Sequence, residues 1–217
     1  MHFNYIPVAS EFIDNEESLL KIIKDYISPL NNLGGCRITA GQVYNQTPIF
    51  YFAATGGTEQ AILKIIAERN KVIKGEPVFL LAHSANNSLP SCLEILARLQ
   101  QESIKGRIFF LNSPQDRNTY QQITEAIDDI EVLRFLKKSR IGLVGEPSDW
   151  LVASSPAPEI VKKVWGPEVV KIDFAEVLEL IKKADPEKTD ILKKVLMESS
   201  VKVTEPDSRE IIDAVKV

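Results

Sequence analysis

The chain alternates short apolar runs, typical of β-strands, with longer runs in which apolar residues recur about once per helical turn. In the helix expected after the fourth strand, the spacing places Leu93, Leu96 and Leu99 on the buried face. Strands are predicted at residues 3–8, 37–44, 48–54, 77–82 and 107–111, and helices at 15–30, 58–68, 89–101 and 119–137.

Three of these strand segments are apolar throughout instead of alternating: residues 50–54, 78–82 and 108–111. Continuous apolar strands are typical of a parallel sheet that helices cover on both faces. We therefore expect residues 1–138 to form a doubly wound parallel α/β domain of the Rossmann or flavodoxin-like type.

A second domain is expected over residues 139–217, where the strand at 140–145 looks like a fresh first strand. Helical patterns follow, but one later strand, at 169–172, is the only partner predicted for it. Two strands are too few for an independent sheet. The second α/β domain is thus expected to be incomplete, either as the front of a longer polypeptide or as a unit that borrows surface from a partner; a natural end with a frayed helix is the alternative.

Charge and composition exclude several classes of partner. The chain carries 26 basic and 30 acidic side chains, a formal net charge of −4, so it lacks the basic surplus that nucleic acid or an anionic membrane surface requires. No apolar stretch approaches the roughly 18 residues of a membrane span. The two cysteines, Cys36 and Cys92, form neither a disulfide framework nor a metal-ligand spacing, and a cytoplasmic location is expected.

Small polar residues gather directly after the predicted strands, where ligands bind in open parallel sheets. Their side chains offer both donors and acceptors, which suits a polyhydroxylated ligand better than a strongly anionic one. The candidate substrate-binding residues here are Ser10, Glu11, Thr55, Gly56, Gly57, Thr58, Glu59, His83, Asn86, Asn87 and Ser113.

The glycine pair and His83 in this set, and Ser88 beside it, each admit two interpretations. Gly56–Gly57 either lets backbone amides approach a phosphate or makes a tight turn with Thr58 as the helix N-cap. His83 is suited to proton transfer or to a structural hydrogen bond. Ser88 either contributes its hydroxyl to the polar segment after the strand or serves as the N-cap of the next helix. A dinucleotide fingerprint, a Walker loop and a nucleophile elbow are all absent from the sequence, so complete catalysis is not encoded in these segments.

In the second domain, the turn after the first strand contains Ser148, Asp149 and Trp150, which complete the candidate substrate-binding set. Trp150 is suited to stacking on a sugar face, although packing in a core is the commoner fate of such a residue.

Residues 140–155, RIGLVGEPSDWLVASS, resemble the "I-G-x-x-G-x-P-S-x-W-L-I-x-S" stretch of the L-fucose/L-arabinose isomerase-like family. The segments FNYIPVAS (3–10), GGTE (56–59) and LLAHSANNSLPSCLE (80–94) are similar to that family's opening α/β domain. The resemblance covers nearly all of this chain and about the first half of a usual family member.

The resemblance implies aldose–ketose isomerisation of a fucose- or arabinose-like sugar with a divalent metal, usually manganese. It places the metal-binding and catalytic residues beyond position 217, so no catalytic or metal-binding residue is assigned to this chain, which is expected to be inactive alone. It further implies a homo-oligomer in which His83, Asn86, Asn87 and the GGTE turn contact the substrate held by a neighbouring subunit. A non-catalytic sugar- or metabolite-binding module is the alternative, and a purely structural oligomer-forming domain is a third.

Overall fold

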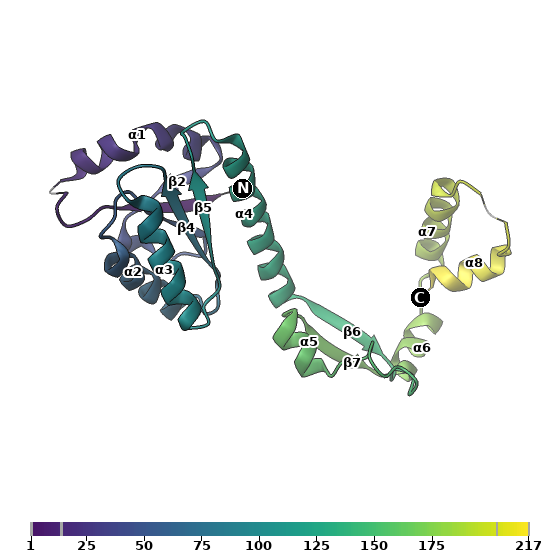
Figure 1. Ribbon diagram of the computed structural model, residues 1–217. Coiled ribbons are helices and arrows are strands. Elements are labelled where there is room, and N and C mark those ends of the chain that lie inside the picture. The colour runs from purple at the N-terminus through teal and green to yellow at the C-terminus, as the bar shows by residue number, and fades with distance from the viewer. Residues whose placement is uncertain (1, 14, 203, 217) are drawn as a thin grey trace. The chain divides into compact units, whose positions relative to one another are not determined.

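The computed structural model describes residues 2–13, 15–202 and 204–216 (Figure 1). The chain divides into two compact units, Met1–Val132 and Leu133–Val217, with the division inside a single helix, α4 (Arg117–Lys138).

The first unit is built on a five-stranded sheet in which every pairing is parallel. The strand order is β2-β1-β3-β4-β5, the flavodoxin-like order, so the doubly wound α/β prediction is confirmed. The strands are β1 (Phe3–Val8), β2 (Gly35–Arg37), β3 (Ile49–Ala53), β4 (Val78–His83) and β5 (Gly106–Leu111).

Helices cover both faces of this sheet because its central strands carry apolar residues on both faces. On one face, Phe50, Phe52 and Phe109 pack with apolar residues of α1 (Glu16–Asn32) and α4. On the other face, Tyr51 and Leu80 pack with α2 (Glu59–Val72) and α3 (Ser88–Gln101).

Two predicted details are wrong. The run 37–44 is not a strand: β2 ends at Arg37, and a 3-10 turn, η1 (Ala40–Gln42), follows. The Gln42 side chain accepts the Thr39 backbone N–H at 2.9 Å, so local polar bonds close this turn. In α3, Leu93 is 53% exposed, because the buried face of the helix includes the small polar residues Ser88 and Ser91 that a count of apolar residues overlooks.

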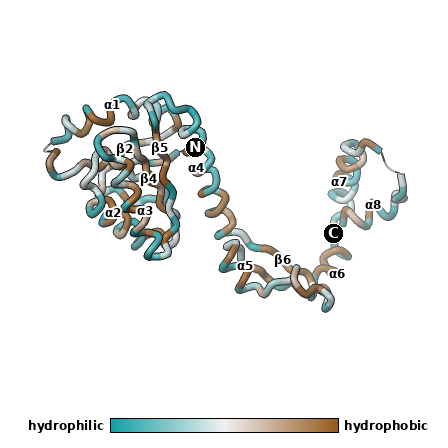
Figure 2. The backbone as a smooth tube through the Cα atoms, viewed as in Figure 1, coloured by the Kyte–Doolittle hydropathy of each residue, from teal (hydrophilic) through white to brown (hydrophobic). Residues whose placement is uncertain are grey.

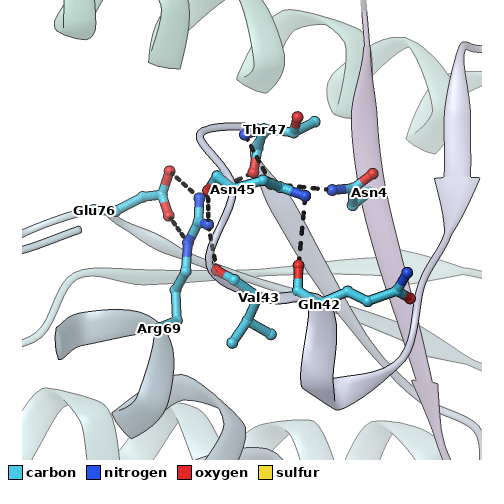
Figure 3. Close-up of polar contacts among 7 residues, drawn as sticks. All are labelled: Asn4, Gln42, Val43, Asn45, Thr47, Arg69 and Glu76. Atoms are coloured by element: carbon cyan, nitrogen blue, oxygen red, sulfur yellow. Dashed lines mark hydrogen bonds and ion pairs between the residues drawn. The ribbon is translucent and has the colours of Figure 1, made fainter. Parts of the chain in front are cut away.

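Beside the amino end of β3, the buried side chain of Arg69, 2% exposed, holds the loop that precedes the strand (Figure 3). Its guanidinium donates to the backbone oxygens of Val43 at 2.7 Å and Thr47 at 2.9 Å, and to that of Asn45. It also pairs in a bidentate manner with Glu76, at 2.8 and 3.3 Å. One cation therefore fastens α2, the 43–47 loop and the segment before β4 to one another.

The second unit contains a two-stranded parallel sheet of β6 (Arg140–Val144) and β7 (Glu168–Ile172). Its further helices are α5 (Pro158–Val164), α6 (Phe174–Lys182), α7 (Pro186–Ser199) and α8 (Ser208–Val215). Figure 2 shows hydrophobic residues along β6 and α6 as well as on the sheet of the first unit. Yet within the described ranges, Ile211 is the one buried hydrophobic side chain that belongs to this second unit.

Among the described residues, none of the helices has the combination of length and apolar character that crossing a bilayer requires.

Candidate functional site

The carboxyl ends of β1, β3, β4 and β5 lie at one edge of the sheet because the four strands are parallel and in register. Val8 lies opposite Ala53, Phe52 opposite Leu81, and His83 opposite Leu111. The chain order reverses between β1 and β3, and this reversal is where flavodoxin-like folds bind ligands. The segments that follow these strands, residues 9–11, 55–59, 84–88 and 112–113, are called the rim below.

Two of the rim segments are joined at the switch point. The Ser10 backbone N–H donates to the Thr55 hydroxyl oxygen at 2.8 Å, and that hydroxyl donates to the Gly56 carbonyl at 3.0 Å. Gly57 has φ +75°, a left-handed conformation that glycine adopts without strain, and a methyl group there would lie 3.4 Å from Ser10 Cβ. The segments after β1 and β3 are thus held side by side by polar bonds.

The segment after β4 contacts the segment after β3 at Gly56. The Gly56 N–H donates to the Asn86 carbonyl at 2.7 Å. A methyl group on Gly56 would lie 2.9 Å from Asn87 Cβ, so only glycine permits this approach. Asn86 and Asn87 are themselves left-handed, with φ of 56° and 54°, and both are exposed. Two exposed asparagines with strained backbones are thus held in succession against the glycine that follows β3.

His83 lies beneath this loop and is 2% exposed. Its Nε2 is 2.9 Å from the Ala54 carbonyl and therefore donates, which leaves Nδ1 to accept the Ala85 N–H at 3.4 Å. The ring packs against Tyr26 and Phe52, with centroids 5.5 and 5.7 Å away. With both nitrogens engaged, His83 fixes the path of the Asn86–Asn87 loop, and direct contact with a substrate stays a prediction.

Ser88 supports the same loop from its own side chain. The hydroxyl accepts the His83 backbone N–H at 2.9 Å and donates to the Ala53 carbonyl. It is not the N-cap of α3, because Asn87 occupies that position and Ser88 is the first helical residue.

Thr58 and Glu59 are less available to a rim ligand. The buried Thr58 hydroxyl donates to the Thr55 carbonyl at 3.1 Å and accepts from the Ser91 hydroxyl at 2.8 Å. Thr58 stands at the N-cap of α2, but its side chain makes no capping bond. Glu59 lines a groove of about 750 Å³ between α2 and α3, together with Glu94 and Arg98.

Ser113 follows β5, the strand beside β4, but its hydroxyl bonds within its own loop, to the Gln115 N–H at 3.3 Å. Asp116 closes this loop by accepting the Thr119 N–H at 3.1 Å and the Asn112 N–H at 3.2 Å. The hydrogen bond from the Thr119 backbone is the main reason why the pKa of Asp116 lies below its ordinary value.

The second unit contains the candidate residues Ser148, Asp149 and Trp150. The Ser148 carbonyl accepts the Leu151 N–H at 3.0 Å, which shapes the turn. The Trp150 side chain is 79% exposed, so it does not pack in a core. Its ring is accessible to a ligand.

One residue of the rim region escaped the sequence analysis. Phe12 is 91% exposed and lies in a turn that the Ile13 N–H closes onto the Ser10 carbonyl at 2.9 Å. Glu11, also exposed, shares the turn. The available signal was an isolated aromatic residue just after a strand, outside any periodic apolar pattern.

Within the described ranges, no three His, Cys, Asp or Glu side chains are grouped so that they could hold a metal ion. Besides amides and hydroxyls, the rim contains two carboxylates, Glu11 in the exposed turn after β1 and Glu59 in the groove between α2 and α3. Both nitrogens of the neighbouring His83 are engaged, so within the described residues these groups do not form a ligand set for a divalent cation such as manganese. No family model and no curated protein matches this sequence.

Proposed function

We propose that this chain is the sugar-binding front part of an aldose–ketose isomerase-like protein and that its rim binds a fucose- or arabinose-like sugar. The observation that carries the proposal is the convergence of Ser10, Thr55 and the glycine pair with Asn86 and Asn87 at the β1/β3 switch point. The resemblance of residues 140–155 to the isomerase-like family supports the same sugar class.

The chemistry of the rim favours a neutral polyhydroxylated ligand. Each sugar hydroxyl is both a donor and an acceptor, and each exposed asparagine carboxamide offers both functions. A phosphate is disfavoured because the Gly56 N–H is already bonded to the Asn86 carbonyl and because Glu59 puts a negative charge in the first turn of α2.

Binding and chemistry are divided in this proposal. The residues described here bind and orient the sugar, with Ser148, Asp149 and Trp150 as further contacts. Proton transfer and the divalent metal are assigned to residues beyond 217 of a longer polypeptide, as the resemblance implies, and the described residues offer no cluster of three metal ligands. Assembly as a homo-oligomer, implied by the same resemblance, belongs to the proposal as well.

The test is a titration of the chain with L-fucose and with L-arabinose, in which binding is measured by amide chemical shifts and by calorimetry. Asn86→Gly and Asn87→Gly remove the carboxamides while keeping a backbone that tolerates positive φ. We expect each to weaken binding by about tenfold, which corresponds to about 1.4 kcal/mol.

Ser103→Gly is the matched control, because Ser103 also has positive φ, 57°, but precedes β5 at the opposite edge of the sheet. The proposal fails if the wild-type chain binds neither sugar, or if all three variants bind as the wild type does. Isomerisation, measured on a longer polypeptide with and without manganese, separates the enzyme from the non-catalytic binding module.

A further inference from the structure

We infer that Phe12, in the turn that continues the first rim segment, is a specificity-determining residue whose ring stacks on the apolar C–H face of a sugar ring. This inference rests on the proposed function, since it concerns the ligand of the same site. It adds a requirement that the polar residues do not impose: the ligand must present a flat patch of C–H groups beside its hydroxyls.

The placement of Phe12 is determined by bonds that anchor its turn to the switch point. The Ser10 N–H donates to Thr55, and the Ser10 carbonyl accepts the Ile13 N–H, so the turn is closed and its first residue is held to the segment after β3. Phe12 lies two residues from Ser10, and its Cα is therefore within about 7 Å of the Ser10 Cα. A ligand that contacts Ser10 and Gly57 is within reach of a phenyl ring carried on this turn.

The exposure of Phe12 is exceptional within the first unit. Among the described residues up to 132, the next most exposed large apolar side chains are Tyr44 and Val132, both at 55%. A bare phenyl ring gains free energy when a ligand removes it from water. The turn beside the switch point is thus the place in this unit where an aromatic surface is most available to a ligand.

The two kinds of group are complementary to a carbohydrate. Carboxamides and hydroxyls of the rim bond the hydroxyl groups, whereas an aromatic ring covers the face from which C–H bonds point. Pockets for small molecules combine apolar lining with a few placed polar groups in this manner. Without Phe12, the rim would supply the polar groups alone.

The experiment compares three Phe12 variants and one control variant of the chain in titrations with L-fucose and L-arabinose. Phe12→Ala removes the ring, and we expect its Kd to rise about tenfold. Phe12→Leu keeps apolar bulk without an aromatic ring, and Phe12→Trp enlarges the ring. Tyr44→Ala is the matched control, since it removes an exposed aromatic residue that precedes β3, at the opposite edge of the sheet.

A ring-current readout makes the stacking visible. Protons on the stacked sugar face should move upfield on binding to the wild type and to Phe12→Trp, and should lose that shift with Phe12→Leu. The inference is overturned if wild type, Phe12→Ala and Tyr44→Ala bind sugar equally, or if Phe12→Ala alters the oligomeric state and not sugar affinity. Absence of sugar binding by the wild type would instead refute the proposed function itself.

Discussion

Replacing Arg69 with methionine tests whether the buried cation holds the first unit together. Methionine keeps an unbranched apolar stem but removes the guanidinium, so the Val43 carbonyl loses its donor and Glu76 loses its bidentate partner. Breaking a buried ion pair from one side costs about 3–5 kcal/mol. The Asn45 and Thr47 carbonyls add little, because Asn45 is exposed and Thr47 half-exposed, so that water can replace the lost donor.

We therefore expect Arg69→Met to lower the free energy of unfolding of the first unit by about 3–5 kcal/mol. Glu76→Gln leaves the cation bonded to three carbonyls and retains one side-chain acceptor, so we expect a smaller loss of about 1–2 kcal/mol. Glu76→Gln is nearly isosteric, so its loss reports the charge of the ion pair without a change in packing, whereas the loss in Arg69→Met also includes the bonds to the carbonyls.

The assay is urea unfolding, monitored by hydrogen exchange of the β3 and β4 amides. Tryptophan fluorescence is unsuitable, because Trp150 and Trp165 both lie in the second unit and are exposed. The midpoint should fall with an unchanged slope. A loss below about 1 kcal/mol for Arg69→Met would show that the ion pair is energetically replaceable, and would refute the reasoning.

Two further predictions concern titratable groups. Burial raises the pKa of the Cys92 thiol to about 12, whereas Cys36 is exposed, so iodoacetamide at about pH 8 should label Cys36 alone until the chain is unfolded. Because the folded state retains the proton of Cys92, the contribution of this thiol to stability is complete below about pH 8.5 and is lost as the pH rises toward 12. Urea unfolding midpoints at alkaline pH would measure this loss. Labelling of both thiols at equal rates would contradict the burial of Cys92. The lowered pKa of Asp116 gives the opposite pH dependence: the contribution of this carboxylate to stability is present above about pH 4 and is lost as the pH falls. Asp116→Asn should remove this acid dependence at a cost of under about 1 kcal/mol of stability near neutral pH. An acid unfolding profile that is identical in wild type and Asp116→Asn would argue against the hydrogen bonds to Asn112 and Thr119.

The layered fold was predictable because the central strands are apolar on both faces. The runs that became β3, β4 and β5 indicate a parallel sheet without any knowledge of neighbours. β2 was misjudged because apolar residues of its predicted run serve a different purpose: Val43, fully buried, packs from the loop after η1. A run of apolar residues reports burial, and burial alone does not specify a strand.

The candidate site was predictable as a set of segments but not as a geometry. That polar residues follow each strand is visible in the chain, whereas the contact of Gly56 with Asn87 depends on β3 lying beside β4. His83 was selected for its chemistry, and its burial between Tyr26 and Phe52 could not be inferred from its neighbours in sequence. Phe12 was missed because an exposed aromatic residue looks like any other apolar residue until its surroundings are known.

The unequal distribution of buried apolar residues between the two units has a thermodynamic consequence. The first unit holds nearly all of the buried hydrophobic side chains in the described ranges, and the second holds Ile211. We expect such a chain to show no single melting temperature, with each unit unfolding with its own enthalpy and cooperativity. A calorimetric trace dominated by one transition would therefore describe the sheet that carries the rim, and would be silent about β6 and β7.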